Sequence, residues 1–459
     1  MSNTTLLLLL LGLSVVAYQA GLFRSRALVT PGSSLRLHSR PRHHGVAVAL
    51  WAVLPAFLVV MLWNFFAPGI IETSLINQLH VTQPELTDQQ VRLALRRIDN
   101  LASNRSLVME TSDWEVATAQ TLSAMRHTSA WILTGLVAMI VAVGLFLSLR
   151  RINPSLRARN QVERMVMILL MLSSGIAILT TVGIVLSMVG ETIKFFTFVS
   201  PVEFFFGTVW QPVFHVTETS GYGQYGMLPL LGGTVLVAVI ALLFAIPVGL
   251  MAAVYLAEYA PQRVRNFAKP ALEVLAGIPT IVYGVFALVT VGPFLASLGD
   301  VFGISIRATS ALTAGLVMGI MLIPFISSLS DDIITQVPKS LRDASLGLGA
   351  TKSETIRKVV LPAALPGIAG AVLLAASRAV GETMIVVLAA GNAPVLTANP
   401  FDAVSTMTVT IVNQLTGDSD FAGPQSLVAF ALGLTLLCIT LVMNVVALVI
   451  VRRYREQYE

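Results

Sequence analysis

Long apolar stretches alternate with short polar segments along most of this chain. Most of these stretches reach the roughly 17 residues that a helix needs to cross the hydrocarbon core of a bilayer. In lipid, each spanning segment must satisfy its own backbone hydrogen bonds, so each is expected to be a helix. The pattern predicts an all-α polytopic membrane protein with nine spans. The predicted spans are residues 6–23, 46–66, 131–149, 165–189, 227–259, 272–298, 311–326, 367–390 and 427–451.

Composition supports the membrane class. The chain has 459 residues, of which 55% are hydrophobic and 12% are charged, whereas soluble domains carry about 25% charged residues. The net charge of +5 therefore does not indicate nucleic-acid binding. The single cysteine excludes a disulfide or a cysteine-based metal site within one chain. None of the six histidines has a zinc-ligand spacing, so no metal site is predicted.

Basic residues indicate the orientation of the spans, because cytoplasmic loops carry an excess of Lys and Arg. They gather in five segments, which are 24–44, 150–164, 258–270, 328–361 and 452–459. This distribution predicts a multi-pass membrane protein with its N-terminus outside and its C-terminus in the cytosol. We interpret 6–23 as a retained helix, and a cleaved signal peptide is the alternative.

Two segments between spans are expected on the outer side. Residues 68–128 contain an amphipathic helical pattern, which predicts a small helical module with either a packing or a binding role. Residues 190–226 are rich in aromatic residues, which favour the headgroup zone. They form either an interfacial hairpin or in-plane helix, or a loop that packs against its own bundle. On the cytosolic side, Glu258 is expected at the interface or paired with a basic residue of the 258–270 turn.

A polar loop between two spans carries strong local signals. Pro338 suits the first position of a helix, and Gly349 suits its end. Thr351 and Glu354 then fit a capping box that starts a second helix. The loop is expected to present a mixed apolar and charged knob that suits docking into a partner's groove. The apolar members of the knob are Leu341, Ala344, Leu346 and Leu348.

This loop resembles the conserved loop of ABC importer permeases, whose pattern is Glu-Ala-Ala, three residues, Gly, nine residues and Ile-x-Leu-Pro. Residues 343–345 read Asp-Ala-Ser, Gly349 follows at the family spacing, and 359–362 read Val-Val-Leu-Pro. Asp343, Ser345 and Val359 are mild departures from the pattern. The resemblance implies that the cytosolic loop at 328–361 is a coupling loop that docks a cytosolic ATPase. The implied docking residues are Leu341, Asp343, Ala344, Ser345, Leu346, Gly349, Leu361 and Pro362.

The chain has no nucleotide-binding loop of its own. Residues 347–353, GLGATKS, lack the adjacent Gly-Lys of a Walker A sequence, and no strand is predicted before them. We therefore expect no cofactor in this chain and ATP bound by a partner. No catalytic residues are predicted, and the chain is interpreted as a transporter subunit and not an enzyme.

The segment SRAVGETM, residues 377–384, places Arg378 and Glu382 in an apolar span. Residues four apart share a face of a helix, and charges within a span usually face a bundle interior or a water-filled cavity. One interpretation puts both in the translocation path, where Arg378 meets an anion and Glu382 holds or gates the guanidinium. The alternative is a structural ion pair, or pairing with a neighbouring subunit.

A more specific resemblance rests on this segment together with 228–234, 255–261 and 272–284, which read LPLLGGT, YLAEYAP and LEVLAGIPTIVYG. The set resembles the PstC-type permease of the phosphate-specific ABC importer. The resemblance covers about residues 165–455, which implies a MetI-like six-helix permease core at 165–459. Residues 1–164, with three spans, are then an extension to which it assigns no role.

The resemblance implies a location in the bacterial inner membrane, where the chain imports inorganic phosphate by an ATP-driven cycle. The implied partners are a PstA-like sister permease, a cytosolic ATPase dimer, an outer phosphate-binding protein and membrane lipid, with no nucleic acid. The alternatives are a permease for another oxyanion, or a membrane scaffold or sensor in phosphate signalling.

Overall fold

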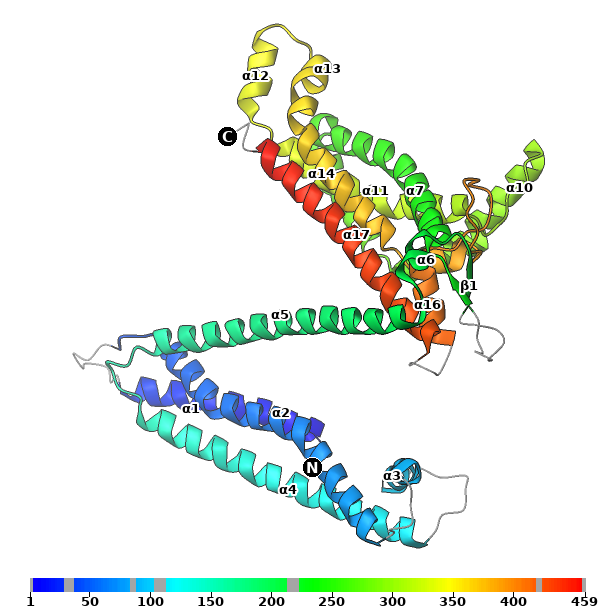
Figure 1. Ribbon diagram of the computed structural model, residues 1–459. Helices are drawn as coiled ribbons and strands as arrows, with labels where there is room; N and C mark the ends of the chain where they lie inside the picture. The colour runs from blue at the N-terminus through cyan, green and yellow to red at the C-terminus, as the bar shows by residue number, and fades with distance from the viewer. Residues whose placement is uncertain are drawn as a thin grey trace. The chain divides into compact units, whose positions relative to one another are not determined.

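The computed structural model describes residues 3–28, 37–82, 88–102, 113–212, 223–417 and 423–455 (Figure 1). The chain forms two compact units, Met1–Ile178 and Leu179–Glu459. The predicted all-α class is confirmed, since most of the described residues are helical. The described residues include nine helices that are long and apolar enough to cross a membrane. The predicted boundary between residues 164 and 165 stays a prediction.

The first unit is a bundle of long helices. Helices α1 (Asn3–Ala27), α2 (Pro41–Thr82) and α4 (Asp113–Arg150) share a core that includes Leu6, Val60 and Leu133. With 42 residues, α2 is about 63 Å long and far exceeds the roughly 30 Å of a bilayer core. The module expected at 68–128 therefore consists largely of continuations of the spans. Helix α3 (Asp88–Ala102) packs against these continuations through an apolar cluster of its own.

The second unit starts within α5 (Ala158–Phe198). Its elements follow in the order α6 (Pro201–Phe206), β1 (Trp210–Pro212), β2 (Gly223–Tyr225), α7 (Leu228–Val254), η1 (Tyr255–Tyr259), α8 (Gln262–Ala276), α9 (Thr280–Phe286), η2 (Ala287–Val291), α10 (Gly292–Phe302), α11 (Ala311–Gln336), α12 (Lys339–Gly347), α13 (Lys352–Thr355), η3 (Ile356–Val360), α14 (Leu361–Val380), α15 (Met384–Ala389), α16 (Met407–Gly417) and α17 (Pro424–Arg455). The η elements are π-helical turns. η2 and η3 are continuous with the α-helices on both sides, whereas η1 continues α7 and ends at Ala260, before α8.

The core of the second unit is centred on α11, which packs closely on α7. Small residues permit this approach. A Cβ atom at Gly319 would lie 2.9 Å from the carbonyl oxygen of Ala241, and one at Gly315 would lie 2.6 Å from Ile240 Cγ2. A larger residue at either position would force the two helices apart.

The aromatic segment beyond α5 packs against its own bundle. Phe195, Phe204 and Tyr225 are fully buried, and the ring of Phe195 contacts each of the other two edge to face. Strands β1 and β2 pair antiparallel, with Trp210 opposite Tyr225. Burial of Tyr225 raises its pKa to about 12. Of the two alternatives for this segment, its described part takes the packed one, while the expectation for residues 213–222 lies outside the described residues.

Two predicted span boundaries were wrong. The span expected from residue 272 starts at Thr280, because Gly277–Pro279 separate it from α8. Proline at 279 disfavours the helical conformation in the residue before it. The span expected at 367–390 ends at Val380, where Gly381–Thr383 interrupt the helix before α15.

Candidate functional site

The loop between α11 and α14 begins with the local structure expected from its sequence. Gly349 has a φ of +86°, a left-handed conformation that glycine adopts without strain. Thr351 Oγ1 accepts a hydrogen bond from the Glu354 N–H, and the Thr351 N–H donates to Glu354 Oε2 over 3.0 Å. The predicted capping box is confirmed. Pro338 lies one residue earlier than expected, at the N-cap of α12, and α11 continues to Gln336, beyond the predicted loop start at 328.

We refer to residues 338–362 as the coupling loop. Its surface presents leucines to solvent, with Leu341 37%, Leu346 47% and Leu348 91% exposed. The other implied docking residues are also at or near the surface. Asp343, Ala344, Gly349 and Pro362 are exposed, and Ser345 and Leu361 are half-buried. Exposed apolar side chains that gather in one patch, and not single ones, are typical of a surface that another protein covers.

Arg342 fixes the coupling loop to the bundle. Its Nη2 atom lies 2.8 Å from Glu258 Oε1 and 2.8 Å from the Ile334 carbonyl oxygen, and its Nη1 donates to the Val337 carbonyl oxygen. The two side chains of the ion pair are only 18% and 11% exposed. Of the two alternatives for Glu258, pairing within the 258–270 turn was wrong, because its partner lies 84 residues away, while a position at the interface stays a prediction. This joint connects α12 to η1 and to the end of α11.

A second ion-pair cluster fastens α8 to α11. Asp331, 1% exposed, accepts from Lys269 over 2.8 Å and from Arg265 over 3.1 Å. Lys269 also pairs with Asp332 over 2.8 Å. The hydrogen bond to Asp331, then the one to Asp332, raises the pKa of Lys269, which therefore stays charged at physiological pH.

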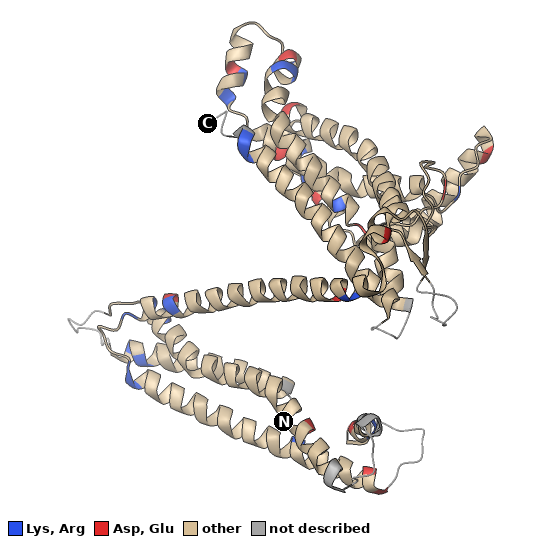
Figure 2. Ribbon diagram, in the orientation of Figure 1, with Lys and Arg blue, Asp and Glu red and all other residues tan. Residues whose placement is uncertain are grey.

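Figure 2 shows charges on α12 and α13, while the long helices are mostly uncharged along their middle.

Arg378 and Glu382 do not share a helix face, so that expectation was wrong. Arg378 lies in the last turn of α14, whereas Glu382 lies in the interruption between α14 and α15. Glu382 Oε1 accepts a hydrogen bond from the Met384 N–H over 3.2 Å, and this bond satisfies a free donor at the start of α15. Thr408 Oγ1 donates to the Glu382 carbonyl oxygen over 2.9 Å.

The side chain of Arg378 is exposed, and its guanidinium lies 5.7 Å from the ring centroid of Phe325. This distance fits a cation–π contact. Among the described residues, Arg378 makes no side-chain ion pair or hydrogen bond, and Glu382 is not its partner. Its charge therefore remains available to something outside this part of the chain.

Residues from other elements of the second unit stabilise the region around the interruption at Gly381–Thr383. Gly284 permits close contact with α15, since a Cβ there would lie 2.9 Å from the Met384 carbonyl oxygen. The chain after α15 returns over the start of α11, where the Ser310 N–H donates to the Ala389 carbonyl oxygen over 3.0 Å. The buried hydroxyls of Thr406 and Thr408 form a hydrogen bond with each other. Sequence reasoning missed this hydroxyl cluster, whose signal is the run STMTVT at 405–410.

No group of three His, Cys, Asp or Glu side chains in the described ranges could hold a metal ion. What the second unit does offer is an exposed knob anchored by an ion pair, and an arginine with free donors beside a broken helix.

Each of the two units overlaps a match to a known protein family. Residues 245–456 match the family described as binding-protein-dependent transport system inner membrane component. Residues 6–180, for which the motifs offered no counterpart, match the family described as phosphate ATP-binding cassette transporter.

Three relatives are similar over about half of this chain. A probable ABC transporter permease, YqgH of Bacillus subtilis, is 37% identical and is covered over 74% of its length, with 52% of this chain. The phosphate transport system permease PstC of Mesorhizobium japonicum is 36% identical, and the match covers 52% of this chain and 74% of that relative. PstC 1 of Mycobacterium tuberculosis is 35% identical, with 55% of this chain and 82% of the relative covered.

A solved structure of the inward-facing methionine ABC transporter MetNI is 22% identical, with a TM-score of 0.38. The match covers 50% of this chain and 97% of the chain in that structure.

The chain belongs to the permease subunits of ABC importers, which are multi-pass inner-membrane proteins and not enzymes. Within that class, it belongs to the PstC-type permeases. The ATPase is a separate component in such systems, so a partner ATPase and other subunits are implied. The predicted ABC-permease fold class is confirmed by the family match, and the described residues contain the nine expected spans. The start of the six-helix core at residue 165 stays a prediction.

Proposed function

We propose that this chain is a permease subunit of an ATP-driven importer of inorganic phosphate. It forms the translocation path together with a sister permease of the PstA type. The relatives named as phosphate transport permeases support the substrate. The chain itself holds no cofactor, and ATP is bound by its partner.

The observation that carries this proposal is the anchored coupling loop. Its exposed leucines offer a surface for an ATPase dimer, and Arg342 ties the loop to η1 and α11 through nearly buried contacts. A push on α12 therefore reaches the membrane helices through short, strong bonds and not through a flexible connection. The proposed docking residues are the eight implied by the family pattern.

The basic loops support an orientation with the N-terminus outside and the C-terminus in the cytosol. An outer phosphate-binding protein then delivers the ion at the side opposite the coupling loop. Along the path, Arg378 offers a guanidinium without a carboxylate partner among the described residues, a group well suited to an oxyanion. Glu382 contributes by shaping the helix interruption that displays this group.

The test is ATP-driven uptake of radiolabelled phosphate by cells that carry Arg378→Ala in a strain without its own importer. We expect uptake to fall at least about tenfold, because an anion in a low-dielectric path loses a charged partner. Arg263→Ala is the matched control, since Arg263 is exposed on α8, outside the coupling loop, and makes no side-chain hydrogen bond or ion pair within the described residues. Normal uptake with Arg378→Ala, at normal amounts of assembled complex, would remove Arg378 from the path.

Substrate identity is tested in the same assay by competition. Excess unlabelled phosphate should abolish uptake of the label, while sulfate and molybdate should leave it unchanged. Inhibition by one of these oxyanions at an equal concentration would favour the alternative of another oxyanion permease.

The compact first unit favours a second role, as a scaffold or sensor in phosphate signalling. Deletion of residues 1–160 discriminates between the roles. Intact uptake with an altered response to phosphate supply would assign regulation to this unit, and lost uptake with normal assembly would assign it to transport.

A further inference from the structure

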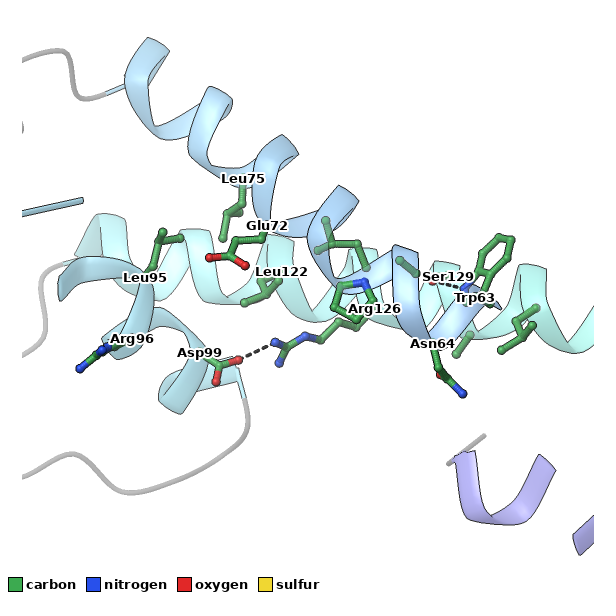
Figure 3. Close-up of a pocket in the computed structure, with 15 residues that line it drawn as sticks. Trp63, Asn64, Glu72, Leu75, Leu95, Arg96, Asp99, Leu122, Arg126 and Ser129 are labelled. Atoms are coloured by element: carbon green, nitrogen blue, oxygen red, sulfur yellow. Dashed lines mark hydrogen bonds and ion pairs between the residues drawn. The ribbon is translucent and has the colours of Figure 1, made fainter. Parts of the chain in front are cut away.

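A hollow in the first unit lies where α3 crosses the ends of α2 and α4 (Figure 3). Its volume is about 690 Å³, which is in the range of small-molecule sites. Apolar side chains, including Ile71, Leu75, Leu95 and Leu122, form much of the wall. The size and the mixed lining are suited to an amphipathic ligand.

The charges in the hollow are only partly paired. Arg126 donates to Asp99 Oδ1, and both side chains are about half exposed. Glu72 has no side-chain partner among the described residues, and Figure 3 shows its carboxylate reaching into the hollow, while Arg96 points away. An arginine has five N–H donors, so Arg126 retains donors beyond the one that Asp99 takes. A ligand thus meets one free carboxylate and one partly used guanidinium.

One side of the hollow borders the apolar part of the spans. Trp63 Nε1 donates to Ser129 Oγ over 2.9 Å, and tryptophan favours the membrane–water interface. Leu133 lies about 10 Å further along α4 than Arg126. A second, mostly apolar hollow of about 740 Å³ shares Trp63, Ala67, Ile71 and Ser129 with the first. A charged hollow and an apolar one therefore flank the same α2–α4 contact, and a small polar solute would use only the first.

We propose that this hollow binds a zwitterionic phospholipid with an amine headgroup. The ammonium group pairs with Glu72, the phosphate takes the free donors of Arg126, and the hydrocarbon lies along Ala130 and Leu133. A purely anionic lipid fits less well, because Glu72 would repel it and Asp99 already offsets much of the charge of Arg126. This site is independent of the phosphate path in the second unit.

The test is native mass spectrometry of the full chain in its purified complex, after exposure to equal amounts of phosphatidylethanolamine and phosphatidylglycerol. We expect the wild-type protein to retain phosphatidylethanolamine preferentially. Glu72→Gln should lower its retention up to about fivefold, the range for one exposed ion pair, and Arg126→Gln should lower retention of both lipids. Glu163→Gln is the matched control, because this exposed carboxylate at the start of α5 does not line the hollow.

Equal retention of the two lipids by the wild type, or an unchanged ratio in Glu72→Gln, would overturn the proposal. Soluble phosphoethanolamine separates the headgroup from the lipid. If it binds as tightly as the lipid, the ligand is a soluble zwitterion and the lipid assignment fails. A matching thermal unfolding midpoint shows that the variants remain folded.

Discussion

Arg342 and Arg378 carry the same guanidinium group at opposite ends of one connected segment, and the structure uses them differently. Arg342 is 18% exposed and donates to a carboxylate and two carbonyl oxygens of its own chain. Arg378 is exposed, and the side-chain interaction that it makes within the described ranges is the cation–π contact with Phe325. The comparison teaches that a guanidinium whose donors are satisfied internally holds structure together. One whose donors are left free is available to a passing ion or to a partner.

The largest effect is expected from Arg342→Ala. Glu258 would be left nearly buried without its partner, and breaking such a pair costs about 3 kcal/mol or more. Thermal unfolding of the purified complex should shift to a lower temperature, and phosphate uptake should fall at least about tenfold. Arg342→Lys keeps the charge but loses the planar fork, so it should lie in between. An unchanged unfolding midpoint in Arg342→Ala would show that this joint does not hold the loop.

A smaller effect is expected from Gly349→Ala. An alanine in the left-handed conformation costs about 1–2 kcal/mol, so the bend between α12 and α13 should loosen. Copurification of the ATPase and uptake should both decrease. Gly347→Ala is a close control, since a methyl group would meet open space at either glycine but only Gly349 has a positive φ. Equal losses in the two variants would mean that added bulk, and not the bend, impairs docking.

Glu382→Ala should destabilise the protein by about 1 kcal/mol, the usual cost of removing a side chain that satisfies a helix N-terminus. Glu382→Gln keeps an acceptor oxygen and should lose less. Uptake should follow stability in this pair. If Glu382→Gln stays stable but loses most uptake, the negative charge itself acts in transport.

The smallest effect on stability is expected from Arg378→Ala. Only the contact with Phe325 is removed, which is worth about 0.5–1 kcal/mol. The unfolding midpoint should hardly change even though uptake is expected to fall. A shift as large as that of Arg342→Ala would erase the contrast between the two arginines and favour an intersubunit structural role for Arg378.

Local signals made much of the coupling loop predictable. The Thr351–Glu354 box and the left-handed Gly349 depend on neighbours within a few residues, and both are where the sequence placed them. The spans were also largely predictable, because apolar length is a local property. Nothing local indicates that Arg342 meets Glu258, since their contact depends on how α11 and η1 end beside each other.

The helix interruption after Arg378, in contrast, could not be predicted from local sequence. Residues 381–383 are flanked by apolar residues on both sides, so a continuous span was predicted through them. The interruption is stabilised by distant groups, notably Thr408 at the Glu382 carbonyl oxygen and Gly284 against α15. These contacts allow Glu382 to serve α15 as a capping group, a choice that a window of sequence cannot reveal.

The π-helical turn η3 determines which way Arg378 points around the axis of α14 relative to α12, which carries Arg342. A π turn closes its hydrogen bonds across one more residue than an α turn, and in an α-helix each residue advances the axis by 1.5 Å and rotates it by about 100°. The azimuth of Arg378 on α14, measured from the coupling loop, therefore depends on the single surplus residue in η3. Loss of that residue would leave the sequence of the α14 span intact and turn its charged side chain toward a different neighbour.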